Sequence, residues 1–322
     1  MTYSRPWMKF AEQLALLKSR GMDVGSEQAA LSYLERIGYY RLSAYWHPFR
    51  VWMMQQHADS GRIASVRTDK FMTGTHFVDA VNLYLFDKKL RLIVLDALER
   101  IEVALRVDIA YLLGKRNTFA HLDVNELHPG FAGKVREGSK TAHQIWCERH
   151  AQLEARSKED FVTHYHAKHG PELPIWVAIE VWDFGAMSQL FAMMKVSDQQ
   201  QISTKYGVGD WKVFQSWLRS LSYLRNLVAH HSRLWNRNVV DQPKLPMHGV
   251  IDWCDIFAGK NDLLAKPFLL LAICRHLTRT ICPGTQWHIR LKEHLQTFPM
   301  QRVPQPRSIA DIGTPTNWEN WW

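Results

Sequence analysis

Residues 76–113 constrain the fold of this chain more than any other stretch, because they carry one long helical pattern without glycine or proline. Apolar residues recur there every three or four positions, which is the spacing of one face of an α-helix. A stretch of this length predicts a central scaffold helix or two helices placed end to end. Its apolar positions are Phe77, Val81, Tyr84, Leu85, Leu92, Leu95, Leu98, Ile101, Leu105, Ile109 and Leu112.

Most of the remaining chain shows the same helical spacing. No segment alternates convincingly between apolar and polar residues, so we predict an all-α fold. Helices are expected at 7–21, 26–37, 141–169, 174–191, 198–206, 210–235, 262–281 and 284–296. Polar or irregular loops are expected at 55–75, where Gly61 and Gly74 punctuate the chain, and at 114–140.

We predict that residues 1–322 form a single domain with three parts. Residues 1–75 form an N-terminal helical part, residues 76–237 a helical core, and residues 238–322 a C-terminal helical part. The chain ends in a tail rich in proline and tryptophan, and the tryptophans of this tail are expected to lie pinned into surface grooves.

The charge balance favours a polyanionic partner. The formal net charge is +9 and the pI is about 9.4. Such an excess suits RNA, DNA or an anionic membrane surface, and charge alone does not choose among them. No apolar run approaches the roughly 18 residues of a membrane span.

Cysteine usage indicates a reducing compartment. The four cysteines are scattered without a CxxC pair, which supports neither a zinc ribbon nor a disulfide framework. The N-terminal sequence lacks the charged and then apolar pattern of a signal peptide. We therefore expect a cytoplasmic protein without a membrane segment. The cysteines are Cys147, Cys254, Cys274 and Cys282.

A dense polar cluster lies at the end of the predicted helix 210–235. Two histidines, three arginines and two asparagines fall within residues 225–237. With about 100° of rotation per residue, a helical wheel places four side chains on one polar stripe, and Arg225 flanks that stripe. The four are Arg219, Asn226, His230 and Arg233.

These residue types fit the cleavage of RNA through its own 2′-hydroxyl. That reaction needs a group that transfers protons near neutral pH, and positive charge for a pentavalent phosphorane. Arginine suits phosphate because its guanidinium fork binds two oxygens at once, and the reaction requires no metal or other cofactor. The alternative interpretation is a histidine that only caps the helix end, near the negative pole of the helix dipole.

Three further groups admit both functional and structural interpretations. Arg116 and His121 repeat the Arg-x4-His spacing, but they follow the point where the helical pattern fails. Glu99 and Glu102 could share a metal on one helix face, although no third ligand follows, and the pairing of Glu102 with Arg106 is expected to be solvated. The histidines of a third group could bind zinc or lie at a solvated helix end: His164, His166 and His169.

Several blocks resemble a known family. Arg225, Asn226 and His230 match the Arg-polar-x4–6-His signature of HEPN domains, and RNLVAHHSRLWNR resembles the corresponding motif of Abi-like proteins of bacterial abortive-infection systems (the AbiD/AbiF type). The other blocks that resemble this family are EQLALLKSRG with YLERIGYYRLSAYWHPF, LYLFDKKLRLIVLDALERIEVALR, and PIWVAIEVWDFGAMSQLF. Together they cover most of residues 8–237.

The resemblance implies an all-helical HEPN fold with additional terminal helices, and metal-independent endoribonuclease chemistry in phage defence. It implies that Arg225 stabilises the phosphorane, that His230 is the acid/base group and that Asn226 orients one of them. It also implies a composite site at a homodimer interface. Some Abi-like proteins are encoded beside a small structured RNA, which makes such a non-coding RNA a candidate partner here. His231, Arg219, Arg233 and Arg237 are the candidate residues for binding RNA.

Two functional hypotheses follow. In the first, the protein is a toxic abortive-infection effector that cleaves RNA to leave a 2′,3′-cyclic phosphate and a 5′-hydroxyl. In the second, the protein is a non-catalytic HEPN module that binds RNA in a regulatory or toxin-antitoxin-like role. Binding by phosphate contacts alone would weaken steeply with salt, without any cleavage.

Overall fold

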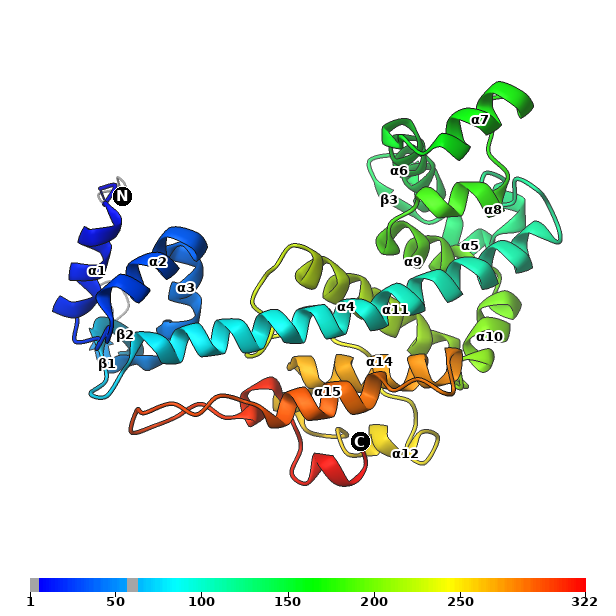
Figure 1. Ribbon diagram of the computed structural model, residues 1–322. Coiled ribbons are helices and arrows are strands. Elements are labelled where there is room, and N and C mark those ends of the chain that lie inside the picture. Colours follow the sequence, from blue (N-terminus) through cyan, green and yellow to red (C-terminus); the bar gives the residue numbers. More distant parts are fainter. Residues whose placement is uncertain (1–5, 57–62) are drawn as a thin grey trace. The chain divides into compact units, whose positions relative to one another are not determined.

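The computed structural model describes residues 6–56 and 63–322 of the chain, which is predominantly helical (Figure 1). The prediction of an all-α fold is confirmed: the described residues form fifteen α-helices and only two small two-stranded sheets. The chain divides into two compact units. Unit 1 comprises Met1–Arg91 and Leu291–Asp311, and unit 2 comprises Leu92–Arg290 and Ile312–Trp322. The prediction of one domain over 1–322 stays a prediction.

The long helix α4 runs from Phe77 to Gly114 without interruption (Figure 1). Of the two predicted arrangements, the single scaffold helix is therefore the one that the structure contains. Its residues up to Arg91 belong to unit 1 and those from Leu92 onward to unit 2. Within unit 2, one face of α4 is fully buried, and its apolar side chains recur at helical spacing. These side chains are Val94, Leu98, Ile101, Leu105 and Ile109.

Unit 1 begins with three helices, α1 (Phe10–Ser19), α2 (Glu27–Ile37) and α3 (Tyr39–Trp46), followed by the short helix η1 (His47–Phe49). Ser26 is the N-cap of α2, because its hydroxyl accepts a hydrogen bond from the Ala29 backbone N–H.

The expectation of a loop over 55–75 is wrong. Strands β1 (Arg50–Gln56) and β2 (Ile63–Phe71) pair antiparallel, with Trp52 opposite Arg67. The hairpin shows no alternation because large apolar side chains are exposed along it, so no buried face imposes a period of two. Gly61 and the rest of residues 57–62 lie outside the described residues.

Unit 2 continues from α4 through short elements, where an irregular segment was expected. These are η2 (Val124–Glu126), α5 (Pro129–Ala132), and the strands β3 (Val135–Glu137) and β4 (Lys140–Thr141), which pair antiparallel.

Three predicted helices of unit 2 are each broken in the structure. The segment 262–281 forms α13 (Asn261–Leu264) and α14 (Pro267–Ile281). The segment 141–169 forms α6 (Ala142–Arg156) and α7 (Asp160–His169), because Ser157 and Glu159 adopt extended backbone between them. The segment 174–191 forms α8 (Ile175–Ala178), η3 (Ile179–Val181) and α9 (Phe184–Met193). Asp183 starts α9 by accepting a hydrogen bond from the Ala186 N–H, so this break is a helix N-cap.

Six further helices complete the helical part of unit 2. They are α10 (Val196–Lys205), α11 (Trp211–Ala229), α12 (Asp252–Asp255), α13 (Asn261–Leu264), α14 (Pro267–Ile281) and the start of α15 (Trp287–Gln296). The short helices η4 (Ile309–Ile312) and η5 (Trp318–Asn320) lie in the tail. The tail tryptophans are packed as predicted, since Trp318 and Trp322 contact Phe268 and are almost fully buried.

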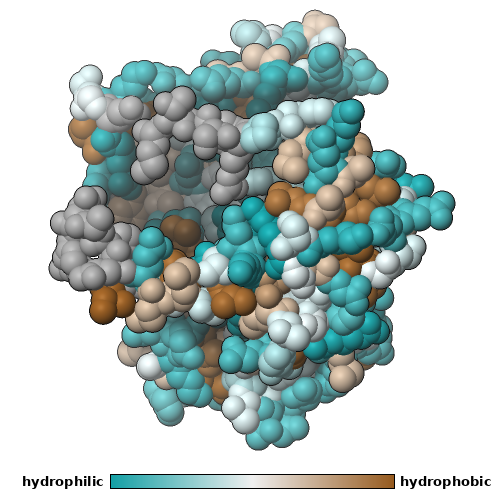
Figure 2. Space-filling view, turned by 90° about the vertical axis from the view of Figure 1, so that its left-hand side faces the viewer, coloured by the Kyte–Doolittle hydropathy of each residue, from teal (hydrophilic) through white to brown (hydrophobic). Residues whose placement is uncertain are grey.

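On the face shown in Figure 2, hydrophobic residues gather in separate patches among hydrophilic ones. None of the helices formed by residues 6–56 and 63–322 is long and apolar enough to cross a membrane.

Candidate active site

The predicted motif lies at the C-terminal end of α11, but this helix is shorter than expected. It ends at Ala229 rather than near Trp235, and His230 is its C-cap. His231 follows in the left-handed region with φ 57°. Its N–H donates to the Val228 carbonyl and the Ser232 N–H to the Leu227 carbonyl, which is a Schellman motif with histidine where glycine is usual.

The early end of α11 changes the predicted polar stripe. Arg225 and Asn226 occupy its last turn, and the His230 N–H still donates to the Asn226 carbonyl at 3.0 Å. The helical wheel therefore holds for Arg219, Asn226 and His230. It is wrong for Arg233, because no helical backbone connects that residue to α11.

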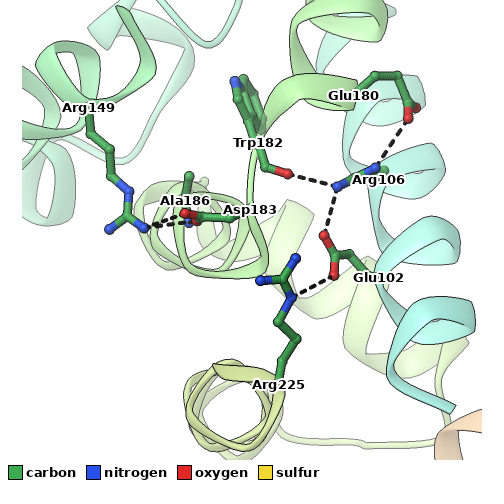
Figure 3. Close-up of polar contacts among 8 residues, drawn as sticks. All are labelled: Glu102, Arg106, Arg149, Glu180, Trp182, Asp183, Ala186 and Arg225. Carbon is green, nitrogen blue, oxygen red and sulfur yellow. Dashed lines mark hydrogen bonds and ion pairs between the residues drawn. The ribbon is translucent and has the colours of Figure 1, made fainter. Parts of the chain in front are cut away.

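Arg225 is held beside α4 by a buried carboxylate (Figure 3). Its Nε lies 3.7 Å from Oε2 of Glu102, and one third of the Arg225 side chain is exposed. Among the described residues, the Arg225 guanidinium has no hydrogen-bond partner within normal distance. Glu102 thus attracts Arg225 without occupying its fork of donors.

Glu102 is itself fixed by Arg106, which lies one turn further along α4 (Figure 3). Nη2 of Arg106 donates to Oε1 of Glu102 and to the Trp182 carbonyl, both at 2.7 Å, and Nη1 donates to Glu180 at 3.3 Å. Arg225 therefore belongs to a network that joins α11, α4 and the α8–α9 connection.

At Glu102, burial and the neighbouring charges shift the pKa of the carboxyl group in opposite directions. Burial raises the pKa of Glu102, while the charges of Arg106 and Arg225 act to lower that pKa. Burial would also raise the pKa of Asp183, but the backbone N–H of Ala186 and the Arg149 guanidinium outweigh burial and lower it. Both oxygens of Asp183 accept from Nη2 of Arg149, at 2.9 and 2.8 Å. Two carboxylates therefore lie on the side of α11 to which Arg225 points.

Replacing Glu102 by glutamine is expected to change how stability depends on pH. A raised pKa means that the folded state prefers the protonated carboxyl. Glu102 therefore contributes stability below its unfolded pKa, and this contribution is lost as pH rises through the folded pKa. E102Q should gain stability relative to the natural protein across that window, as measured by urea unfolding at a series of pH values. A constant difference between the two proteins would contradict the burial of this charge.

Asn226 and His230 present their side chains to solvent. Both residues are exposed, and neither side chain has a hydrogen-bond or ion-pair partner within residues 6–56 and 63–322. Functional polar groups without partners are available to a ligand. The alternative that the His230 ring caps the helix receives no support, because the cap contacts are made by backbone groups.

The candidate RNA-binding residues lie at different positions along and after α11: His231, Arg233 and Arg237 follow the helix, whereas Arg219 lies on it about three turns before its end. Arg219 is exposed, and its Nε lies 3.4 Å from Oδ1 of Asp241. Nε of Arg237 donates to the Tyr223 hydroxyl at 3.1 Å. His231 is exposed and Arg233 is half-buried.

Sequence reasoning missed the structural role of Glu102 and Arg106. The expectation that they form a solvated pair is wrong, since Glu102 is only 7% exposed. The burial of Glu102 could have been predicted from the sequence, because Glu102 follows the buried Ile101 and lies one turn after Leu98 on α4. The sequence pattern gives no comparable indication that Asp183 and Arg149 pair near this site.

The second Arg-x4-His string is structural. The Arg116 guanidinium pairs with Asp198 and Glu126, and His121 is completely buried. Arg116 is therefore engaged by two carboxylates, and the buried His121 cannot reach an RNA ligand. In the other histidine cluster, His166 pairs with Glu154 at 2.7 Å. The described residues contain no group of three or more His, Cys, Asp or Glu side chains arranged to hold a metal ion.

Fold and motif together define an all-α protein with an Arg-Asn-x3-His sequence at the end of a buried helix. The family model described as Abi-like protein matches residues 32–236, and the chain belongs to this family. Membership suggests a role in abortive infection and a possible nuclease activity. Comparisons with curated proteins and with solved structures find no match.

Proposed function

We propose that this protein is a metal-independent HEPN endoribonuclease that acts as an abortive-infection effector. One observation carries the proposal: Arg225, Asn226 and His230 lie at one helix end with their functional groups available. The carboxylate of Glu102 holds the Arg225 guanidinium at 3.7 Å without a hydrogen bond. The other two side chains are exposed and have no partner among the described residues.

The proposed reaction is an intramolecular transesterification, in which the 2′-oxygen of the RNA replaces the 5′-oxygen on phosphorus. A histidine takes the proton of the 2′-hydroxyl, and the 2′-oxygen attacks the adjacent phosphorus. The bond from phosphorus to the 5′-oxygen breaks, and a histidine donates a proton to that oxygen. The products are a 2′,3′-cyclic phosphate and a 5′-hydroxyl. Arg225 neutralises the charge of the pentavalent phosphorane, as guanidinium forks do for phosphoryl oxygens.

The other candidate residues orient the catalytic groups or bind the RNA. Asn226 orients Arg225 or His230. The phosphates of the RNA are bound by His231, Arg219, Arg233 and Arg237. The proposal also includes a homodimer, in which two copies of the motif form one composite site, and a cytoplasmic location. A small structured non-coding RNA is a further candidate partner.

The proposal is tested by incubating the purified full-length protein with labelled RNA in the presence of EDTA. We expect cleavage to persist and the new ends to carry a 2′,3′-cyclic phosphate and a 5′-hydroxyl. Loss of cleavage on adding EDTA would contradict the chemistry. Salt-sensitive binding without any cleavage would instead support a non-catalytic RNA-binding module.

A further inference from the structure

A pocket of about 430 Å³ lies in unit 2, between α5, β3, α6, α9 and α11, which lie together in that unit (Figure 1). It shares no described residue with the groove that contains Arg225. Pockets of about 300–1,000 Å³ hold small organic ligands. We name it the glutamine pocket, after six residues of its lining: Phe131, Lys134, Arg136, Ile145, Gln189 and Gln215.

The glutamine pocket combines amide groups with apolar walls. Gln189 on α9 and Gln215 on α11 each bring an amide, which both donates and accepts hydrogen bonds. Neither amide has a hydrogen-bond partner among the described residues. Phe131, Ile145 and Met193 add apolar surface. Two amides without partners beside an apolar wall match a nucleobase, which has flat apolar faces and a polar edge.

Two positive charges border the same pocket. Lys134 and Arg136 are exposed, and neither side chain forms an ion pair or a hydrogen bond with another described residue. Among the described residues of the lining, none carries a carboxylate. Cations without counter-ions beside a pocket for a base suit the phosphate of the same nucleotide.

The exposed side of α11 connects the glutamine pocket to the motif. Gln215, Ser222 and Asn226 lie within about 40° of one another around the helix axis, and His230 lies about 40° beyond Asn226. All four are exposed or half-buried. Gln215 and His230 are about 22 Å apart along the axis, which spans about six nucleotides of a stacked strand and fewer of an extended one. A strand bound at the motif can therefore reach the pocket along one side of α11.

Arg149 lies beside this route, one turn after Ile145 on α6. A side chain at Gly185 would begin 3.1 Å from Nη2 of Arg149 and 3.5 Å from the Ser222 hydroxyl. Nη2 of Arg149 binds both oxygens of Asp183 and so neutralises that carboxylate (Figure 3). Nε and Nη1 of Arg149 have no partner among the described residues, which leaves them available to a phosphate between the pocket and the motif.

We propose that the glutamine pocket binds one unpaired nucleotide of the RNA substrate, several positions from the cleaved bond. The amides of Gln189 and Gln215 bind the edge of the base. Lys134 and Arg136 bind its phosphate. This inference rests on the proposed function, because that function places the cleaved bond at His230. Contacts with a base carry sequence information, whereas contacts with phosphates do not. The pocket thereby makes cleavage depend on the base at one fixed distance from the cut.

The contact with the base is tested with a pool of RNA molecules of random sequence. The full-length protein cleaves the pool in EDTA, and the new ends are sequenced. For the natural protein we expect one base to be enriched at a fixed position within about seven nucleotides of the cut. In Q189A/Q215A this enrichment should disappear, while cleavage itself continues. Q201A is the control, because Gln201 is exposed on α10, and it should keep the enrichment. A natural protein without the enrichment, or the same enrichment in Q189A/Q215A, would overturn the proposal.

The contact with the phosphate is tested by binding. The probe is a labelled single-stranded RNA with 2′-O-methyl groups throughout, which cannot be cleaved through its 2′-hydroxyls. Each phosphate contact with a single strand contributes about 0.7 to the slope of log affinity against log salt, so K134A/R136A should lower that slope by about 1.4. R156A/K158A removes the same charge from exposed positions at and after the end of α6 and should keep the slope. An unchanged slope in K134A/R136A contradicts the proposal. Circular dichroism checks the fold of each variant.

The two readouts separate this inference from the proposed function. If no RNA is cleaved but both pocket variants bind the 2′-O-methyl RNA more weakly than their controls, the proposed function fails and the pocket stands. If RNA is cut without a base preference that depends on the pocket, the pocket inference fails and the ribonuclease stands. A free nucleoside monophosphate that binds the natural protein but not Q189A/Q215A, with the preference for RNA unchanged, would assign the pocket to a free nucleotide and overturn the proposal.

Discussion

Replacing either Arg225 or His230 by alanine is expected to reduce RNA cleavage by about 10²–10⁴-fold, with little change in stability. R225A removes the positive charge that stabilises the phosphorane. H230A removes the group that transfers protons. Because the His230 side chain is exposed and the Arg225 guanidinium has one long ion-pair contact, neither truncation disturbs the core. The rate is measured under single-turnover conditions with EDTA present.

His231 provides the matched control for His230. Its backbone lies at φ 57°, a conformation that glycine adopts without strain. H231G therefore removes the neighbouring imidazole and preserves the Schellman motif at the end of α11. We expect H231G to cleave within about tenfold of the natural rate, because RNA binding and not proton transfer is its proposed role. If H230A cleaves normally while H231G does not, the acid/base group has been assigned to the wrong residue.

The second large effect concerns the buried histidine His121. This side chain is completely buried, and neither ring nitrogen has a hydrogen-bond partner among the described residues. Burial, with smaller contributions from His150 and His143, lowers the pKa of His121 to about 3. The folded state therefore holds this imidazole neutral at pH values where the unfolded chain binds a proton.

The sign of the pH effect follows from this lowered pKa. The contribution of His121 to stability is complete above its unfolded pKa of 6.5 and is lost progressively as pH falls toward 3. The loss reaches on the order of 4 kcal/mol by pH 3, at about 1.4 kcal/mol per pKa unit. Unfolding by urea between pH 7 and pH 4 should show the decline.

Replacing His121 by phenylalanine should flatten this dependence. The aromatic ring fits beside Trp182 and His150, and the substitution removes a buried donor without a partner, so H121F should gain about 1 kcal/mol at pH 7. H164A is the control, because His164 is exposed. If H121F and the natural protein lose stability in parallel below pH 6.5, His121 does not carry the acid sensitivity.

The all-α class and the long helix α4 were predictable because both depend on local apolar periodicity. Helix ends were less predictable, since they depend on single backbone conformations. The residue type of His231 does not indicate a left-handed φ, so the sequence predicts a helix that continues to Trp235, whereas α11 ends at Ala229. The breaks at Ser157 and Asp183 likewise lie in segments whose apolar spacing continues on both sides.

The hairpin of β1 and β2 was not predictable from alternation, because its exposed side chains include Trp52, Met53 and Met54. At the candidate site, the sequence identified Arg225, Asn226 and His230 from their spacing and their resemblance to a family motif. It could not identify Glu102 as the ion-pair partner of Arg225, because the contact joins α4 and α11 across more than one hundred residues.

The most direct test of the central claim uses an RNA in which one nucleotide is 2′-deoxy. The position of cleavage is first mapped with the natural protein and EDTA, and the 2′-hydroxyl at that position is then removed. If Arg225 and His230 promote attack by the 2′-oxygen, cleavage at that bond should disappear while neighbouring bonds remain sensitive. Cleavage of the 2′-deoxy bond at an unchanged rate would contradict the account, because water and not the RNA itself would then supply the attacking oxygen.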